Sequence, residues 1–154
     1  MKTLILVFIL LSVSVCNIYA QNKTIKGRVI DERLERMPGV SVVINDTVKV
    51  GDTDLDGFFK IEIPVSVKKV SLAFVGFDPT IVGLTDNCSE LEVVMMLAGT
   101  YDFVTLKRAD KLRMRMFKML PELHKQAFEK GIFKTDKACY TQEFVPFYYK
   151  KKQK

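Results

Sequence analysis

IKGRVIDERLERMPGVSVVI, residues 25–44, is the stretch of sequence that decides the fold. In residues 25–29 apolar residues and glycine alternate with charged ones, which is typical of a β-strand with one buried face. Pro38-Gly39 predicts a turn, because proline fixes φ and glycine tolerates a positive φ. Residues 40–44 are β-branched except for Ser41 and predict a central strand.

The same alternation of apolar runs and turn residues continues to residue 97. It predicts further strands at residues 48–51, 59–63, 70–74, 80–84 and 91–97. Phe59 and Phe74 fall on inward positions of these strands. Roughly seven short strands with no amphipathic helix between them predict an all-β sandwich or open barrel.

Four motifs in this region carry a family resemblance. They are Ile25–Val29, Met37–Val42, Thr53–Phe59 (TDLDGFF) and Phe74–Phe77 (FVGF). In that order and spacing, the chain from Lys23 to Leu97 resembles the carboxypeptidase-regulatory-like domain, a transthyretin-like (prealbumin-like) β-sandwich. The family is common in Bacteroidetes-type envelope proteins, often at the head of TonB-dependent receptors. Its usual Leu before Pro-Gly is Met37 here.

The resemblance implies a seven-stranded sandwich over residues 21–98, followed by an extension over residues 99–154 that the family does not cover. It also implies an accessory domain without a peptidase. Enzyme chemistry finds little support in the residues themselves, because the chain has one histidine, His124, and no evident nucleophile beside it. We expect no catalytic residues and no cofactor, and we expect His124 to be a solvated helix residue.

Residues 1–20 have the anatomy of a secretory signal peptide. Lys2 is followed by an apolar run from Leu4 to Val15, and Ala20 offers a small residue for cleavage. The run is about a dozen residues, whereas a membrane-spanning helix needs roughly 20. Lipidation at Cys16 is disfavoured because Val15 stands where a lipobox has a small residue. We therefore expect export, to the periplasm or the outer-membrane periphery.

Loss of Lys2 with that peptide would lower the formal charge from +6 to +5. A basic balance favours anionic partners such as acidic proteins or lipid head groups, and export separates the chain from nucleic acid. Cys88 and Cys139 remain in the exported part. In an oxidising compartment they either pair as a disulfide or stay as two small hydrophobic residues, and the sequence leaves both alternatives open.

Two short motifs suggest modification or metal binding. Asp52, Asp54 and Asp56 begin a D-x-D-x-D-G pattern like that of a calcium loop, but its twelfth position is Ile63 instead of a bidentate Glu. A plain β-turn without metal is the better interpretation. Asp46-Thr47-Val48 resembles a Bacteroidetes O-glycosylation signal, which makes Thr47 a candidate for a sugar.

The extension predicts two helices, residues 104–119 and 121–130, because Pro121 is favoured in a first helical turn and Gly131 provides a stop. Three roles remain open for the first helix and its basic residues: packing on the sandwich, binding a partner, or lying on an anionic membrane. The aromatic segment after Cys139 is suited to adding a strand to the sandwich edge or to another protein. The partner-binding candidates are Arg113, Met116, Phe117, Leu120, Phe147 and Tyr148.

These observations favour a non-catalytic exported protein whose sandwich is a rigid platform and whose C-terminal extension binds another envelope protein. The alternative is a module that binds glycan or peptide through the sandwich surface. The absence of Trp and the inward positions expected for the strand aromatics favour the first hypothesis.

Overall fold

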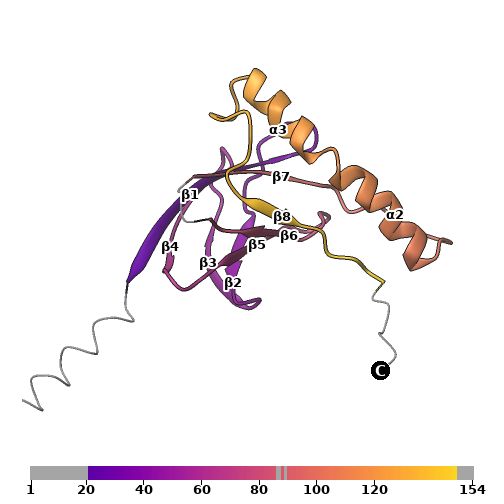
Figure 1. The fold of residues 1–154 in the computed structure, drawn as a ribbon, viewed down its shortest axis with the longest axis horizontal. Coiled ribbons are helices and arrows are strands. Elements are labelled where there is room, and N and C mark those ends of the chain that lie inside the picture. Colours follow the sequence, from indigo (N-terminus) through magenta and orange to yellow (C-terminus); the bar gives the residue numbers. More distant parts are fainter. Residues whose placement is uncertain (1–20, 86–87, 89, 149–154) are drawn as a thin grey trace, which may run out of the picture.

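The computed structural model describes residues 21–85, 88 and 90–148. Two β-sheets face each other, and two helices lie together on one side of them, next to β7 and β8 (Figure 1). The chain is thus predominantly β, in agreement with a sandwich. The signal peptide expected over residues 1–20 lies outside the described residues.

The first sheet has three strands in the order β4-β1-β7. Its members are β1 (Asn22–Asp31), β4 (Phe58–Pro64) and β7 (Glu90–Met95). The long central strand β1 pairs antiparallel with β4 and parallel with β7. β7 is therefore an edge strand of this sheet.

The second sheet has five strands in the order β3-β2-β5-β6-β8. Its members are β2 (Ser41–Ile44), β3 (Val48–Asp52), β5 (Lys69–Ala73), β6 (Thr80–Gly83) and β8 (Thr141–Glu143). The seven strands expected between residues 25 and 97 are confirmed. β8 comes from the C-terminal segment, which pairs with the sandwich edge through antiparallel β6. The extension after residue 98 therefore completes the second sheet.

The main core lies between the two sheets and contains the inward residues of their strands. Phe59 is buried there as expected, opposite Gly27 of β1. Phe74, expected inward, is 39% exposed. That prediction is wrong because β5 ends at Ala73, so Phe74 lies in the following turn and packs edge-on against Phe77 at 5.8 Å between ring centroids.

A second core covers the outward face of the three-stranded sheet. Ile30 of β1 and Val94 of β7 are fully or almost fully buried on that face. They pack against α3 (Leu120–Glu129) and the segment after it, through Leu120, Leu123, Ala127 and Phe133. β7 is consequently buried on both faces.

Two helices precede β8, as predicted. α2 (Leu106–Phe117) begins after Thr105, whose side-chain oxygen accepts a hydrogen bond from the backbone N–H of Arg108 at 3.3 Å. Pro121 lies in the first turn of α3, where the missing N–H costs nothing. Gly131 follows the helix with φ of 70°, a conformation that glycine adopts freely.

Gly27 should not tolerate a side chain. A Cβ there would lie 2.5 Å from the ring of Phe59 and would also collide with the carbonyl oxygen of Leu91. We predict that Gly27→Ala lowers the free energy of unfolding by about 2 kcal/mol, a typical cost of overpacking, measured by urea denaturation. The loss should be smaller in a Phe59→Leu background. An unchanged denaturation midpoint would show that the two strands can separate freely at this point.

Candidate functional site

After α3 the chain returns across the edge of the sandwich as the C-terminal strap, residues 130–148. The strap passes β7, forms β8 and then runs back along α2 (Figure 1). A disulfide joins its Cys139 to Cys88, with 5.4 Å between the Cα atoms. The structure therefore adopts the paired alternative that the sequence left open.

Glu92 is the polar residue that holds the strap on β7. Its buried carboxylate accepts hydrogen bonds from the backbone N–H groups of Lys134 and Thr135 and from the Thr135 hydroxyl. The hydroxyl of Tyr140 donates to the Glu92 carbonyl oxygen at 2.7 Å. Because burial of a carboxylate is costly unless it is hydrogen-bonded, these contacts specify where the strap lies.

His124 of α3 lies beside this carboxylate and is 3% exposed. Its Nε2 atom is 4.0 Å from a Glu92 oxygen and has no hydrogen-bond partner among the described residues. Burial lowers the pKa of His124, while the nearby Glu92 charge opposes that shift. The expectation of a solvated histidine is wrong, because α3 turns this side chain onto the outward face of β7.

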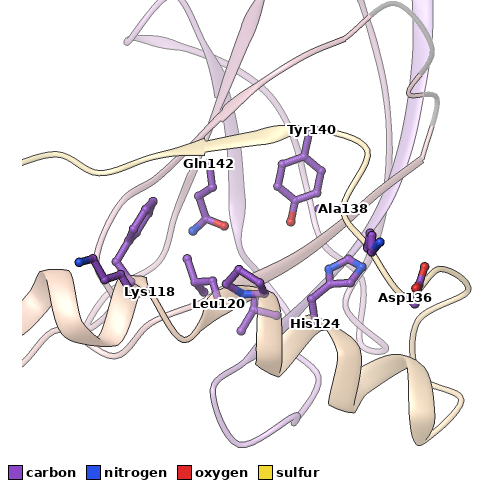
Figure 2. A pocket seen from close by; sticks show the side chains of 11 residues that line it. Lys118, Leu120, His124, Asp136, Ala138, Tyr140 and Gln142 are labelled. Atoms are coloured by element: carbon purple, nitrogen blue, oxygen red, sulfur yellow. The ribbon is translucent and has the colours of Figure 1, made fainter.

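A pocket of about 510 Å³ lies between the helices, β7 and the strap. Its lining is mainly apolar and includes Val94, Phe117, Leu120 and Pro121. In Figure 2, Gln142 and Tyr140 point from the strap toward Leu120 and His124 of the helix. A cavity of this volume is in the usual range for small-molecule sites, roughly 300–1,000 Å³.

Arg113 fixes the other end of the strap. Its Nε donates to Asp78 at 2.9 Å, and its Nη1 donates to Asp110 at 3.2 Å and to the carbonyl of Val145 at 2.8 Å. The guanidinium also lies 3.7 Å from the ring centroid of Phe147, a cation–π arrangement. The same Asp110 accepts the backbone N–H groups of Phe147 and Tyr148, each at 2.8 Å.

These contacts correct part of the predicted partner-binding set. Arg113 and Leu120 are buried within the protein, because α2 and α3 turn them toward the sandwich. Met116 and Phe117 are partly buried against the second core. Phe147 and Tyr148 are 46% and 47% exposed, so they are accessible to a partner.

The accessible aromatic residues belong to a larger group near the start of α2. The fully exposed Phe103 precedes the helix and the exposed Leu106 opens it. Tyr101 packs edge-on against Phe147 with ring centroids 6.4 Å apart. We call this group the aromatic patch, consisting of Tyr101, Phe103, Leu106, Phe147 and Tyr148.

The outward face of α2 and the residue after it is basic. Its exposed cations are Lys107, Arg108, Lys111, Arg115 and Lys118. None of them forms a salt bridge with another residue in the described part of the chain. α2 therefore presents positive charge that is not neutralised by the fold.

The carboxylates of the calcium-like motif are occupied by other contacts. Asp52 accepts from the Ser41 hydroxyl and pairs with Lys49, whose hydrogen bond is the main cause of its lowered pKa. Asp54 closes the turn by accepting the backbone N–H groups of residues 56 and 58. Asp56 pairs with Arg36 at 2.6 Å. The segment is a hydrogen-bonded β-turn, and within the described ranges no three His, Cys, Asp or Glu side chains are grouped to hold a metal ion.

Thr47 lies in the exposed turn between β2 and β3, where its hydroxyl donates to the Asn45 carbonyl at 3.3 Å. The position is accessible, and glycosylation there stays a prediction.

Glu92, Tyr140 and Gln142 were missed as site residues by the sequence reasoning. For Glu92 a signal existed, since it is the one charged residue in the otherwise apolar run of residues 91–96.

Comparison with known proteins assigns no family to the chain. No family model and no curated protein matches it. A similar solved structure is the major plantain pollen allergen Pla l 1, with 14% identity, a TM-score of 0.32, and coverage of 55% of this chain and 100% of the allergen. A likeness of that size carries no argument. Among the described residues, no helix has the length and hydropathy to cross a bilayer.

His124 should make the stability pH-dependent near neutrality. Because its folded pKa is below the unfolded value of about 6.5, the unfolded chain takes up the proton more readily. This stabilising contribution is complete above about pH 6.5 and declines as the pH falls below it. Urea unfolding at pH 7.5 and 5.5 should show a smaller acid loss for His124→Gln than for the parent. Equal losses would contradict the buried neutral imidazole.

Arg113 should be a stability residue. Arg113→Met leaves the carboxylates of Asp78 and Asp110 without their cation, and removing one partner from a buried pair is strongly destabilising. We expect a loss of about 3 kcal/mol in the free energy of unfolding, measured with urea. Arg115→Met, on the exposed face of the same helix, should change it by less than about 0.5 kcal/mol. Similar losses of unfolding free energy for both variants would contradict a stabilising role of the Arg113 contacts.

Proposed function

We propose that this chain is an exported, non-catalytic binding module of the carboxypeptidase-regulatory-like kind. In this proposal a transthyretin-like sandwich is the rigid platform, and the aromatic patch beside α2 is the contact surface for another cell-envelope protein. The observation that carries the proposal is the exposure of large apolar side chains at the start of α2 and in residues 147–148, which are bound to α2 through Asp110, together with unneutralised positive charge on the same helix. Exposed apolar clusters rimmed by polar residues mark interaction sites.

The patch has a rigid support, which favours specific protein binding. Phe147 is held by Arg113 and Tyr101, and the backbone of Tyr148 is held by Asp110. Leu106 lies one turn before Asp110 on the same side of α2. Aromatic side chains that are already ordered lose little entropy on binding, and they dominate the energetics of protein interfaces.

The charge of α2 indicates the chemistry of the partner. Five exposed cations form no salt bridge with the described residues, so the complementary surface is acidic around an apolar centre. A membrane fits this helix less well. Interfacial helices bury an apolar face in the lipid, whereas the inward face of α2, with Ala109 and Arg113, is already packed in the protein.

A non-catalytic role is supported by the contacts of His124, Cys88 and Cys139, which carry reactive types of side chain. His124 is enclosed beside Glu92, and Cys88 and Cys139 are joined to each other. A nucleophile–base pair of the acyl-transfer type needs both groups accessible and within hydrogen-bond reach. These residues serve the fold instead.

The test is in-cell cross-linking and pull-down of the full-length protein with Phe103→Ser/Leu106→Ser. One recurrent envelope partner should be recovered with the parent and reduced at least tenfold with this variant, since losing an apolar anchor at an interface centre often costs more than 1.4 kcal/mol. Val48→Ser/Val65→Ser is the matched control, because it removes two exposed apolar residues at the opposite end of the sandwich, where the β2–β3 and β4–β5 turns lie.

The whole extension is unsuitable for deletion, because residues 101–154 include β8, Cys139 and the cover of β7. Recovery of no partner, or equal recovery with both double variants, would contradict the proposal. Co-sedimentation of the parent with anionic vesicles, lost in the Phe103/Leu106 variant in the absence of any protein partner, would assign the patch to a membrane and also overturn it.

A further inference from the structure

The pocket behind the strap offers a second binding site: no residue of the aromatic patch lines it, and it shares Lys118 with the basic face of α2. We propose that it binds a carboxylate carried on an apolar body. The interior of the pocket is mainly apolar, and its lining includes a lysine, Lys118, that has no salt bridge with the described residues.

The interior suits an apolar body. Val94 lines the pocket from β7, Leu120 and Pro121 line it from α3, and Tyr140 lines it from the strap. Two of the polar groups behind this surface are hydrogen-bonded within the protein: the Tyr140 hydroxyl donates to the Glu92 carbonyl oxygen, and the Glu92 carboxylate accepts from the Thr135 hydroxyl. His124 Nε2 has no hydrogen-bond partner among the described residues, but it lies 4.0 Å from a Glu92 oxygen, and burial lowers the pKa of the imidazole. The carboxylate of a ligand would lose its hydration here beside the Glu92 carboxylate, so burying it this deep is unfavourable.

The two ends of the pocket differ in charge. Figure 2 shows Asp136 on one side of the pocket, and Lys137, the next residue in the chain, also lines it, so opposite charges are adjacent in the sequence there. Lys118 and Gln142 both line the pocket and lie on the side opposite Asp136 in Figure 2, and Lys118 has no salt-bridge partner in the described part of the chain. The flexible lysine stem can bring its ammonium over this end, and the Gln142 amide adds N–H donors.

These features place a carboxylate at the Lys118–Gln142 end, with its apolar body lying along Leu120 and Tyr140. Two kinds of molecule carry this chemistry. One is a free medium-chain aliphatic acid, and the other is the C-terminal carboxylate of a peptide that ends in apolar residues. Both make the same charge-assisted contact, so the experiment includes a separate arm for each.

The test is a ¹H–¹⁵N NMR titration of the full-length protein with sodium octanoate, with octanol and octylammonium as matched ligands. A second arm uses an apolar hexapeptide with a free C-terminus and its amide-capped form. Binding of the carboxylate form should be saturable and should shift the resonances of Val94, Leu120 and residues 136–142. The alcohol, ammonium or capped form should bind at least tenfold more weakly.

Variants locate the head group. Lys118→Gln and Gln142→Leu should each weaken carboxylate binding about tenfold, as expected for loss of one charge-assisted hydrogen bond. Lys137→Gln is the matched control at the other end of the pocket and should change affinity less than twofold. Lys118 is exposed, so its variant should retain the ligand-free spectrum and keep the test valid if Gln142→Leu disturbs β8.

The two arms distinguish the sources. Saturable binding of octanoate, of the free-carboxylate peptide, or of both supports the site and names its ligand class. The proposal is overturned if neither binds, if octanol binds as tightly as octanoate, or if Lys137→Gln weakens binding as much as Lys118→Gln. Shifts confined to the aromatic patch would also overturn it, without bearing on the proposed protein contact.

Discussion

The fold depends on one constraint: β7 is an edge strand that is buried on both faces. Its inward residues complete the core between the sheets, and Val94 on the other face would be left in water by a two-sheet sandwich alone. Covering that face with α3 buries the second core. The cover also brings the strap across the edge, where the carboxylate of Glu92 accepts hydrogen bonds from the backbone N–H groups of Lys134 and Thr135. The extension is thus required by the strand it covers.

Arg113 holds the far end of the strap against α2, as Glu92 holds the strap on β7. A buried guanidinium between two carboxylates is weak evidence for net stability, because desolvation offsets much of the attraction. Its fork of donors does fix geometry, since Asp78 precedes β6, Asp110 lies on α2, and Val145 follows β8. Three segments distant in sequence are held in one register by a single side chain. The same contacts order the aromatic patch. Arg113 lies over the ring of Phe147, and Asp110 accepts the backbone N–H groups of Phe147 and Tyr148.

Local patterns were enough to predict the seven strands, the two helices and the glycine turns, because alternation and turn chemistry act over a few residues. They failed where partners are distant. Arg113 looked like one more surface cation, since its partner Asp78 is 35 residues away and Val145 is 32 residues away. His124 looked solvated for the same reason, since its environment is made by Glu92 and Phe133. The run Leu-Glu-Val-Val-Met-Met did contain the missing information, because a strand buried on both faces is nearly continuous in apolar residues.

The pocket follows from how the cover is attached. α3 rests on the first sheet while β8 pairs with the second, so helix and strap diverge where the two sheet edges separate. Tyr140 spans part of that gap by reaching Glu92, and the disulfide fixes the strap one residue earlier. The remaining space is bounded by segments that keep their positions only while the strap is docked. A molecule that binds in the pocket therefore stabilises the docked strap, and the docked strap strengthens binding by the same coupling free energy. Occupancy of the pocket and order of the C-terminal segment are thermodynamically linked.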